Sequence, residues 1–278
     1  MTATSNTKSL PDLSSRYEVS DAQVREFQEN GHVFLPGVCS AEEVAAYRQE
    51  ILEATAERRA AVSDLSTRDT YGKAFIQMTN LWEEHEGTRR FVYSKRLAQI
   101  ATDLMDVSGA RLYHDQALFK EAHGGFTPWH QDQFFWPLDS KAITIWMPLV
   151  DLTEDMGIMK FASKSHTLGY LADIGGISDD SEAQIDEVVR GKGLELNGQV
   201  VMKAGDATFH DGWTLHRAPG NRTDTMREVM TVIYFTDGAK VLEPDNDNRE
   251  ADRDAWLKRQ PGEIADGELN PVLYSRNA

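Results

Sequence analysis

The sequence predicts a mainly β protein with flanking helices, because two parts of the chain differ in the way this fold class requires. From about residue 110 onward, short segments rich in Val, Ile, Thr and aromatic residues are separated by Gly, Asp and Asn, which is typical of a β-sandwich or barrel. Before that point, apolar residues recur with the spacing of amphipathic helices. The chain has 278 residues, 40% of them hydrophobic, so it can bury a full core.

The N-terminal part begins with a polar stretch. Residues 1–19 are rich in Ser and Thr, and we expect them to form a flexible arm. Ser20 precedes residues 21–30, which have the character of a short helix, and Gly31 follows them. Because Ser is a favoured N-cap and Gly a favoured helix terminator, this arrangement predicts a helix between these two residues.

Further elements are expected before the β-rich part. Residues 31–37 form a short apolar run that contains a proline, which predicts an edge strand. Ser40 and Glu43 have the spacing of a capping box, and the residues after them carry an apolar stripe at helical spacing. Residues 63–86 are expected to be irregular, whereas residues 87–106 again predict a helix.

The β-rich part contains seven segments with strand character. They are residues 110–120, 142–152, 157–162, 198–205, 206–212, 213–218 and 226–237. Residues 171–197 are rich in Asp, Glu and Gly and predict a surface insertion. No linker divides the chain, so we expect one domain over residues 20–278. Its parts are helical support (20–108), a double-sheet core (109–240) and an acidic tail outside the core (241–278).

Composition narrows the possible partners. The chain has 29 Lys and Arg against 45 Asp and Glu, a net charge of −16, which disfavours binding to nucleic acid phosphates or to an anionic membrane. Cys39 is the single cysteine, so a reducing cytoplasmic location is expected. The sequence has no 18-residue apolar run and no hydrophobic stretch in its first 20 residues, which predicts neither a membrane span nor a secretory signal. We therefore expect a small-molecule substrate.

A pattern of metal-binding side chains lies in the β-rich part. His130 and Asp132 are two residues apart, so on a strand both side chains would point to the same face. His216 is the candidate for a third ligand. Two histidines and one carboxylate leave three coordination positions open, which is the arrangement of non-haem Fe(II) oxygenases. Taken alone, the His130–Asp132 pair is better explained as a surface histidine beside an aspartate.

The choice of the distant histidine is not settled by periodicity, since His210 and His216 have the same parity. Asp211 and Gly212 predict a turn that separates these two histidines into different strands. We favour His216 because Arg227 follows it after a loop rich in turn-forming residues, and the returning strand would bring the guanidinium near the metal. There it could bind a carboxylate in bidentate fashion. The alternative is an arginine paired with acidic residues at the surface.

Taken together, residues 20–240 resemble the phytanoyl-CoA dioxygenase family of Fe(II)/2-oxoglutarate-dependent oxygenases. The resemblance implies that His130, Asp132 and His216 bind Fe(II) and act as the catalytic centre. It also implies that Arg227 binds the distal carboxylate of 2-oxoglutarate, with Trp146 beside the cosubstrate or simply in the core. Three further segments also match the family pattern: residues 156–159, residues 163–166, and the segment from Gly205 and Asp206 to Asn221.

The resemblance has consequences for fold and chemistry. It implies a double-stranded β-helix, also called a jelly roll and similar to the cupins. It implies three cofactors or cosubstrates: Fe(II), 2-oxoglutarate and O2. The expected reaction couples decarboxylation of 2-oxoglutarate to oxidation of a substrate C–H bond, giving hydroxylation, cyclisation or epimerisation. We expect the context to be the tailoring of secondary metabolites such as antibiotics.

The sequence departs from the family pattern at two places. The family often has Ser two residues after the distal histidine, where it bonds the cosubstrate, but Ala218 stands here. Thr127, Gln116 or Thr231 is expected to replace that contact. In the family, Pro-Gly often precedes Ser-His. In this chain, residues 163–164 at that position are Ser-Lys. Asp132 keeps the carboxylate that related halogenases lack, so halogenation is not expected.

Large aromatic residues near the proposed ligands predict a mostly apolar pocket and a neutral, largely apolar substrate. They are Trp129, Phe134, Phe135, Trp136 and Trp213. Packing in the core is the alternative for each of them. Two other functions remain open at this point: a cupin-type metalloenzyme that does not use 2-oxoglutarate, and a non-catalytic jelly-roll module that binds a ligand.

Overall fold

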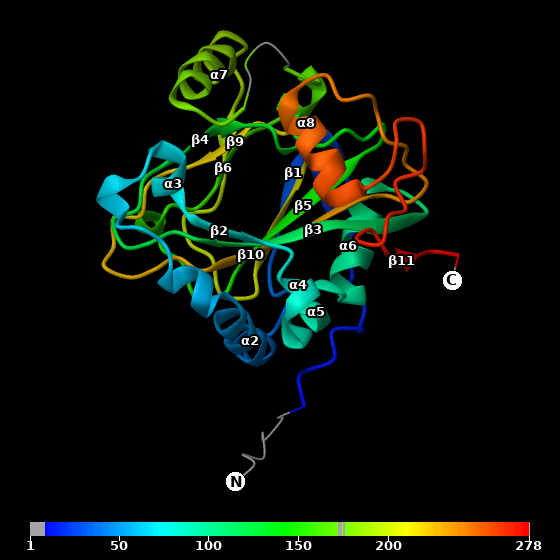
Figure 1. Ribbon diagram of the computed structural model, residues 1–278, viewed down its shortest axis with the longest axis horizontal. Coiled ribbons are helices and arrows are strands. Elements are labelled where there is room, and N and C mark those ends of the chain that lie inside the picture. The colour runs from blue at the N-terminus through cyan, green and yellow to red at the C-terminus, as the bar shows by residue number, and fades with distance from the viewer. Residues whose placement is uncertain (1–8, 172–173, 175, 278) are drawn as a thin grey trace.

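Two antiparallel sheets with helices around them form the fold (Figure 1). They are seen in a computed structural model that describes residues 9–171, 174 and 176–277. This architecture confirms the predicted mainly β fold with flanking helices. Within the described residues, no helix is long and apolar enough to cross a membrane.

The large sheet joins strands that are far apart in the sequence. Its order is β1 (His32–Leu35), β8 (Ala207–Asp211), β5 (Ala142–Pro148), β10 (Val229–Thr236), β3 (Gly109–Phe119) and β11 (Val272–Ser275), and β2 (Ile76–Thr79) also pairs with β3. The small sheet has the order β4 (Thr127–His130), β9 (His216–Ala218), β6 (Lys160–Ala162) and β7 (Leu196–Asn197). The strand predicted within residues 31–37 is confirmed and lies at the edge of the large sheet.

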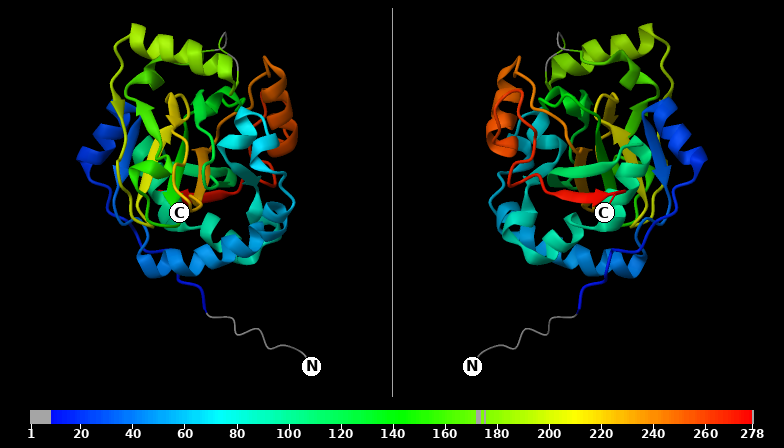
Figure 2. Two further views of the ribbon diagram at one scale, coloured as in Figure 1. Left: turned by 90° about the vertical axis from the view of Figure 1, so that its left-hand side faces the viewer. Right: turned by 90° about the vertical axis from the view of Figure 1, so that its right-hand side faces the viewer.

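Helices surround the two sheets. They are α1 (Asp21–Asn30), α2 (Ala41–Ala60), α3 (Thr70–Ala74), α4 (Leu81–Glu84), α5 (Glu86–Val92), α6 (Lys95–Met105), α7 (Asp179–Gly191) and α8 (Asp247–Asp252). Helices α7 and α2 lie at opposite ends of the molecule in every view (Figures 1 and 2). The predicted N-caps are confirmed, because Ser20 and Ser40 each form a complete capping box at the start of α1 and α2.

The central strands of the large sheet serve both the core and the site. Side chains alternate between the two faces of a strand, and the register pairs Val232 with Ile145 and Thr231 with Trp146. Val232 and Ile145 belong to the main apolar cluster, whereas Thr231 and Trp146 line a pocket on the other face. The same two strands therefore fix the position of the pocket relative to a rigid core.

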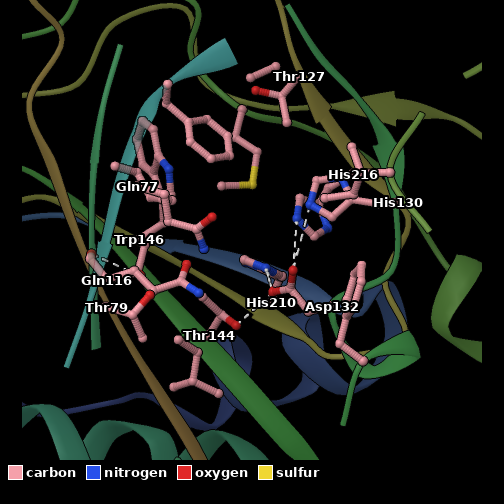
Figure 3. A pocket seen from close by; sticks show the side chains of 18 of the residues that line it. Gln77, Thr79, Gln116, Thr127, His130, Asp132, Thr144, Trp146, His210 and His216 are labelled. Atoms are coloured by element: carbon pink, nitrogen blue, oxygen red, sulfur yellow. Dashed lines mark hydrogen bonds and ion pairs between the residues drawn. The ribbon is translucent and has the colours of Figure 1, made fainter. Parts of the chain in front are cut away.

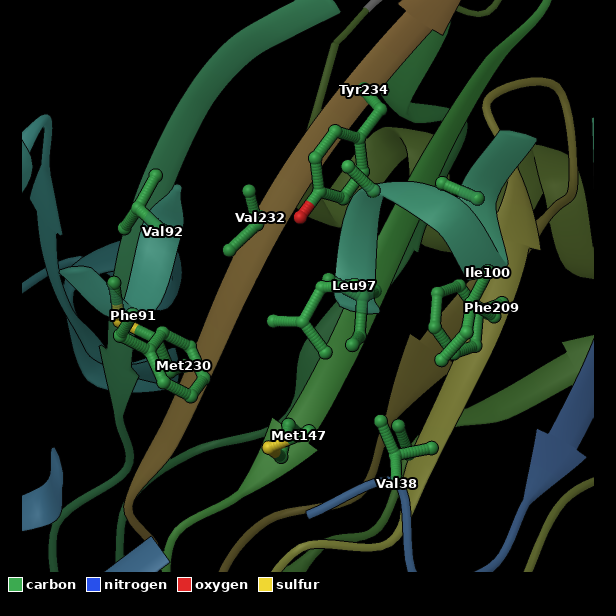
Figure 4. Close-up of a cluster of buried hydrophobic side chains, with 14 of the residues drawn as sticks. Val38, Phe91, Val92, Leu97, Ile100, Met147, Phe209, Met230, Val232 and Tyr234 are labelled. Atoms are coloured by element: carbon green, nitrogen blue, oxygen red, sulfur yellow. The ribbon is translucent and has the colours of Figure 1, made fainter. Parts of the chain in front are cut away.

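Helix α6 covers the apolar face of the large sheet (Figure 4). Its Leu97 and Ile100 are fully buried. They belong to the same cluster as Met147, Phe209 and Val232, which come from three different strands. This packing anchors the helical layer to the strands that carry the site.

Replacing Leu97 by alanine is expected to lower the free energy of unfolding by about 2–5 kcal/mol, since it removes buried methyl groups and leaves a cavity. Urea denaturation measures the change. The matched control is Lys95→Ala on the exposed side of the same helix, where a change within about 0.5 kcal/mol is expected. Equal losses in the two variants would contradict the packing of α6 on the sheet.

The prediction that residues 63–86 are irregular is wrong. This segment contains α3, β2 and α4. Each has only four or five residues, which is too short to show a helical or strand period in the sequence. Strand β2 exists because it pairs with β3, a contact that the local sequence does not reveal.

Two other predicted elements also differ. Residues 87–106 form two helices rather than one, because Ser94 interrupts the run and caps α6 by accepting a hydrogen bond from the Leu97 amide. Residues 198–205 were expected to form a strand, but this segment contributes only an isolated bridge between Met202 and Leu152.

Both terminal segments pack more closely than their composition predicts. Of the expected flexible arm, residues 1–8 lie outside the described residues, whereas Leu13 is buried in the main core. The Tyr47 hydroxyl also donates to the Pro11 carbonyl at 2.5 Å. The acidic tail was expected to lie outside the core, but it returns to the large sheet as β11 and buries Leu257 completely.

Candidate active site

Two histidines face each other across neighbouring strands of the small sheet. His130 ends β4 and His216 begins β9, and the antiparallel register pairs them directly. The Nδ1 atoms donate to backbone carbonyls two residues earlier, that of His130 to Pro128 at 2.8 Å and that of His216 to Thr214 at 2.9 Å. These bonds place the imidazole protons on Nδ1 and leave both Nε2 atoms with a free lone pair.

Asp132 places a carboxylate oxygen beside these two nitrogen atoms (Figure 3). Its Oδ1 lies 3.6 Å from Nε2 of His130 and 3.5 Å from Nε2 of His216. The three atoms lie within 4.8 Å of one another. The expectation that His130 and Asp132 share a strand is wrong, because β4 ends at His130 and Asp132 begins a 3-10 turn, η2 (Asp132–Phe134).

The charge states of these side chains suit a metal ion. Burial lowers the pKa of both His130 and His216, so their imidazoles are neutral. Burial works against ionisation of Asp132, yet His216 and the hydrogen bond from His210 hold the pKa of this carboxyl well below its ordinary value. Two neutral imidazole nitrogens and one carboxylate oxygen are a donor set that fits Fe(II).

Two hydrogen bonds fix the second carboxylate oxygen of Asp132. Its Oδ2 accepts hydrogen bonds from the Thr144 hydroxyl at 2.8 Å and from Nε2 of His210 at 3.0 Å. The turn expected after His210 is confirmed, because His210 lies in β8 of the large sheet and His216 in β9 of the small sheet. His210 therefore orients Asp132 and is not one of the three candidate metal ligands. We call these ligands, His130, Asp132 and His216, the triad.

Replacing His210 by phenylalanine is expected to weaken metal binding about 10–100-fold, the usual cost of losing an outer hydrogen bond to a ligand. Phenylalanine keeps the ring but cannot donate to Asp132, so only the hydrogen bond from Thr144 still orients the carboxylate. Anaerobic titration with Fe(II) measures the affinity. His123→Ala is the control, since the His123 side chain is 66% exposed. Unchanged affinity in the His210 variant would contradict the orienting role.

The triad opens into a cavity of about 370 Å³ between the two sheets. Both sheets contribute to its lining: Thr127, His130 and His216 come from the small one, and Gln77, Gln116 and Thr144 from the large one. Figure 3 shows these side chains around a common space. The volume falls within the range of about 300–1,000 Å³ that is usual for small-molecule sites.

Arg227 lies in the same cavity and is 2% exposed. Its Nη1 donates to the Gly157 carbonyl at 2.7 Å, and its guanidinium carbon lies 5.3 Å from the centre of the Trp146 ring. Gly157 has φ +75, and a Cβ there would lie 2.3 Å from the Pro219 carbonyl oxygen, so only glycine fits without rearrangement.

No carboxylate balances this buried charge. Among the described residues, Arg227 forms no ion pair, and its Nε is buried without a hydrogen-bond partner. Burial lowers the pKa of Arg227 to about 9. The loop before Arg227 was expected to close a hairpin, but it passes from β9 in the small sheet to β10 in the large sheet. The guanidinium nevertheless faces the cavity that contains the triad.

The other predicted cosubstrate contacts also line this cavity. Trp146, Thr127, Gln116 and Thr231 all belong to its wall, as does Ala218. Thr127 lies directly opposite Ala218 in the register of β4 and β9. The Thr231 hydroxyl instead donates to the Gln116 carbonyl at 3.1 Å. Thr127 is therefore the hydroxyl placed nearest to the position where the family pattern has Ser.

The predicted aromatic lining is only partly correct. Of the five residues named from the sequence, Phe135 and Trp136 line the cavity. The lining as described does not include the other three. Trp129 packs in an apolar cluster with residues of α7, while Phe134 and Trp213 lie against Tyr170.

These observations agree with a match to a known family. The model of the phytanoyl-CoA dioxygenase (PhyH) family matches residues 27–229, well over half of the chain. The chain belongs to the phytanoyl-CoA dioxygenase family. No curated protein sequence matches it significantly. The matched range contains both histidines, Asp132 and Arg227.

Solved structures of similar fold include enzymes that use 2-oxoglutarate (α-ketoglutarate). The non-heme α-ketoglutarate-dependent carbocyclase SnoK from nogalamycin biosynthesis has 25% identity and a TM-score of 0.74, and the match covers 92% of this chain and 96% of SnoK. The epimerase SnoN from the same biosynthesis has 26% identity and a TM-score of 0.72, covering 91% of this chain and 98% of SnoN. EctD from S. alaskensis, at 19% identity and a TM-score of 0.63 over 83% of this chain and 82% of EctD, shares the fold.

The chain is thus an enzyme of the Fe(II)/2-oxoglutarate-dependent oxygenase class with an HxD…H triad. Fe and 2-oxoglutarate are typical of the phytanoyl-CoA dioxygenase family, and SnoN has been solved with Fe3+ and α-ketoglutarate. The sequence missed several members of the pocket wall. Tyr71 and Phe75 lie in the segment expected to be irregular, and Trp256 lies in the tail expected outside the core.

Proposed function

We propose that this enzyme oxidises a C–H bond of a small, largely apolar organic molecule in the tailoring of a secondary metabolite. His130, Asp132 and His216 would hold Fe(II), and Arg227 would hold the distal carboxylate of 2-oxoglutarate. The observation that carries the proposal is a buried guanidinium that faces the same cavity as the triad and has no counter-charge among the described residues. An isolated buried charge is costly unless a ligand of opposite charge compensates it.

The spacing along β5 supports this assignment. Thr144 bonds Asp132, and Trp146, two residues further along the strand, lies against Arg227. Two residues of a strand span about 7 Å, a spacing comparable to the length of a short dicarboxylate, which supports binding of 2-oxoglutarate between the triad and the guanidinium. A cupin-type enzyme that does not use 2-oxoglutarate would have no need for this buried arginine.

Iron bound by the triad, with 2-oxoglutarate and O2, would supply the oxidising power needed to oxidise an unactivated C–H bond. The residues of the chain position the participants. The carbonyls of Pro128 and Thr214 keep Nε2 of each histidine directed at the metal site, and Thr144 keeps Asp132 from turning. The apolar side chains in the wall, such as Phe75, Trp146 and Met159, favour a substrate with apolar surface.

The solved relatives support the substrate class. SnoK and SnoN are described as a carbocyclase and an epimerase from nogalamycin biosynthesis, and SnoN has been solved with nogalamycin RO. The structural match to this chain covers more than nine-tenths of SnoK and of SnoN. A small secondary metabolite is therefore the substrate type that we propose for this pocket.

Succinate formation tests the proposal. The purified chain with Fe(II), 2-oxoglutarate and O2 is expected to form succinate slowly without substrate and faster with a secondary metabolite that it accepts as substrate. Mass spectrometry then identifies the outcome: gain of one oxygen for hydroxylation, loss of two hydrogens for cyclisation, and no mass change for epimerisation. Absence of succinate with iron-loaded, folded protein would overturn the proposal.

A further inference from the structure

The cavity has a second polar region on the C-terminal helix. Asp252 ends α8, and the chain continues as a π-helical turn, η6 (Arg253–Leu257). Asp252 and Trp256 line the cavity that contains the triad. Single π-turns at the end of an α-helix occur frequently at functional sites. This wall is not needed for binding iron or 2-oxoglutarate.

A β-bulge orients the partners of Asp252. The register of β3 and β10 pairs Ile233 with His114 and Tyr234 with Leu112, so Tyr113 is an extra residue. Such a bulge re-aims side chains beside active sites. Here it turns Tyr113 and His114 toward the same side of the sheet, and the Tyr113 hydroxyl donates to Oδ2 of Asp252 at 2.8 Å.

The carboxylate of Asp252 has no positively charged partner among the residues that the structure describes. Within the described ranges, no Lys, Arg or His forms an ion pair with it, although burial raises its pKa to about 7 against the hydrogen bond from Tyr113. His114 beside it is 3% exposed, and its Nδ1 has no hydrogen-bond partner in the described part of the chain. Burial lowers the pKa of His114 to about 3, so this ring does not supply the missing charge.

Aromatic side chains lie near this carboxylate: Tyr113 bonds it, and Trp256 follows four residues later in the same turn. The Tyr113 ring lies 5.3 Å from the Trp136 ring, and the His114 ring lies 5.6 Å from the Trp256 ring. Trp136 and Trp256 both line the cavity. Aromatic faces attract an ammonium group within about 6 Å, and such cages recognise cationic amines. A carboxylate that shares a cavity wall with aromatic side chains therefore has the chemistry of an amine-binding site.

We propose that the substrate carries a protonated amino group, and that Asp252, Tyr113, His114, Trp136 and Trp256 form the subsite that binds it. We call these five residues the amine subsite. The inference rests on the proposed function, because it names the substrate class of the same pocket. It refines the expectation of a neutral substrate: the scaffold is apolar, and one basic group anchors it by pairing with Asp252.

Two matched probes test the amine subsite. Naphthylmethylamine and naphthylmethanol share one apolar ring system and differ in the amine. Calorimetric titration uses the full chain, at a pH above the pKa of Asp252 and below that of the amine. Wild type is expected to bind the amine at least about ten-fold more tightly than the alcohol, as for a hydrogen-bonded charged group. Asp252→Asn is expected to lose this preference while still binding the alcohol.

Two controls make the result specific. Asp254→Asn removes an exposed acid from the same turn and is expected to keep the preference. Repeating the titration with EDTA excludes coordination of the amine to a metal. Equal binding of both probes to wild type, binding of neither, or an unchanged preference in Asp252→Asn overturns the inference. Succinate formation in wild type tests the proposed function separately, so the two can fail independently.

Discussion

Alanine in place of Asp132 is expected to abolish both iron binding and succinate formation. The substitution removes one of the three proposed ligand atoms, and it also leaves Thr144 and His210 without their shared acceptor. The loss of metal affinity should exceed the roughly 10–100-fold expected for the His210 variant, which disturbs only the orientation of the carboxylate. Anaerobic Fe(II) titration and succinate measurement follow the two effects.

Asp155→Ala is the matched control for this variant, since the Asp155 side chain is 59% exposed and pairs with Arg222 at the surface. It should bind iron as wild type does. If Asp132→Ala bound iron as tightly as wild type, the metal would have to lie elsewhere. If it bound iron weakly and still formed succinate at the normal rate under iron saturation, the carboxylate would not be part of the catalytic centre.

Glutamine in place of Arg227 is expected to raise the KM for 2-oxoglutarate about 10–100-fold, because it removes a charge-assisted hydrogen bond. Glutamine retains a donor for the Gly157 carbonyl but carries no charge. The unliganded variant should be at least as stable as wild type, since the buried guanidinium has no counter-charge in the described structure. Steady-state kinetics and thermal melting measure the two quantities.

Added 2-oxoglutarate should raise the melting temperature of wild type but not of the Arg227 variant, because a ligand stabilises only the state that binds it. Arg222→Gln is the control, with a side chain that is 75% exposed. A 2-oxoglutarate-dependent stabilisation of equal size in Arg227→Gln would show that another residue holds the distal carboxylate.

The triad could be predicted from the sequence because its members carry rare chemistry at fixed spacing. His130 and Asp132 are nearly adjacent, and the strand-forming residues around His216 predict the strand on which it lies. The sequence could not show that β4 and β9 pair with His130 opposite His216. The sequence also left the role of His210 open. That role depends on a hydrogen bond from His210, in the large sheet, to Asp132, in the turn after β4.

The pocket wall was much harder to predict. Tyr71 and Phe75 lie in or beside short elements without a sequence period, and Trp256 lies in a polar, acidic segment. Their place in the wall depends on tertiary contacts such as the pairing of β2 with β3. Trp129 and Trp213 were expected in the wall from their nearness in sequence to the ligands, but adjacent residues point to different sides of a strand or turn.

The position of α8 has a consequence for how related enzymes come to accept different substrates. The family match ends at residue 229, so the proposed ligands of iron and 2-oxoglutarate lie inside it, while Asp252 and Trp256 lie beyond. One side of the substrate chamber is therefore built from sequence that the shared pattern does not cover. Exchange of this C-terminal stretch between related proteins would offer evolution a route to new substrates that leaves the oxidising machinery intact.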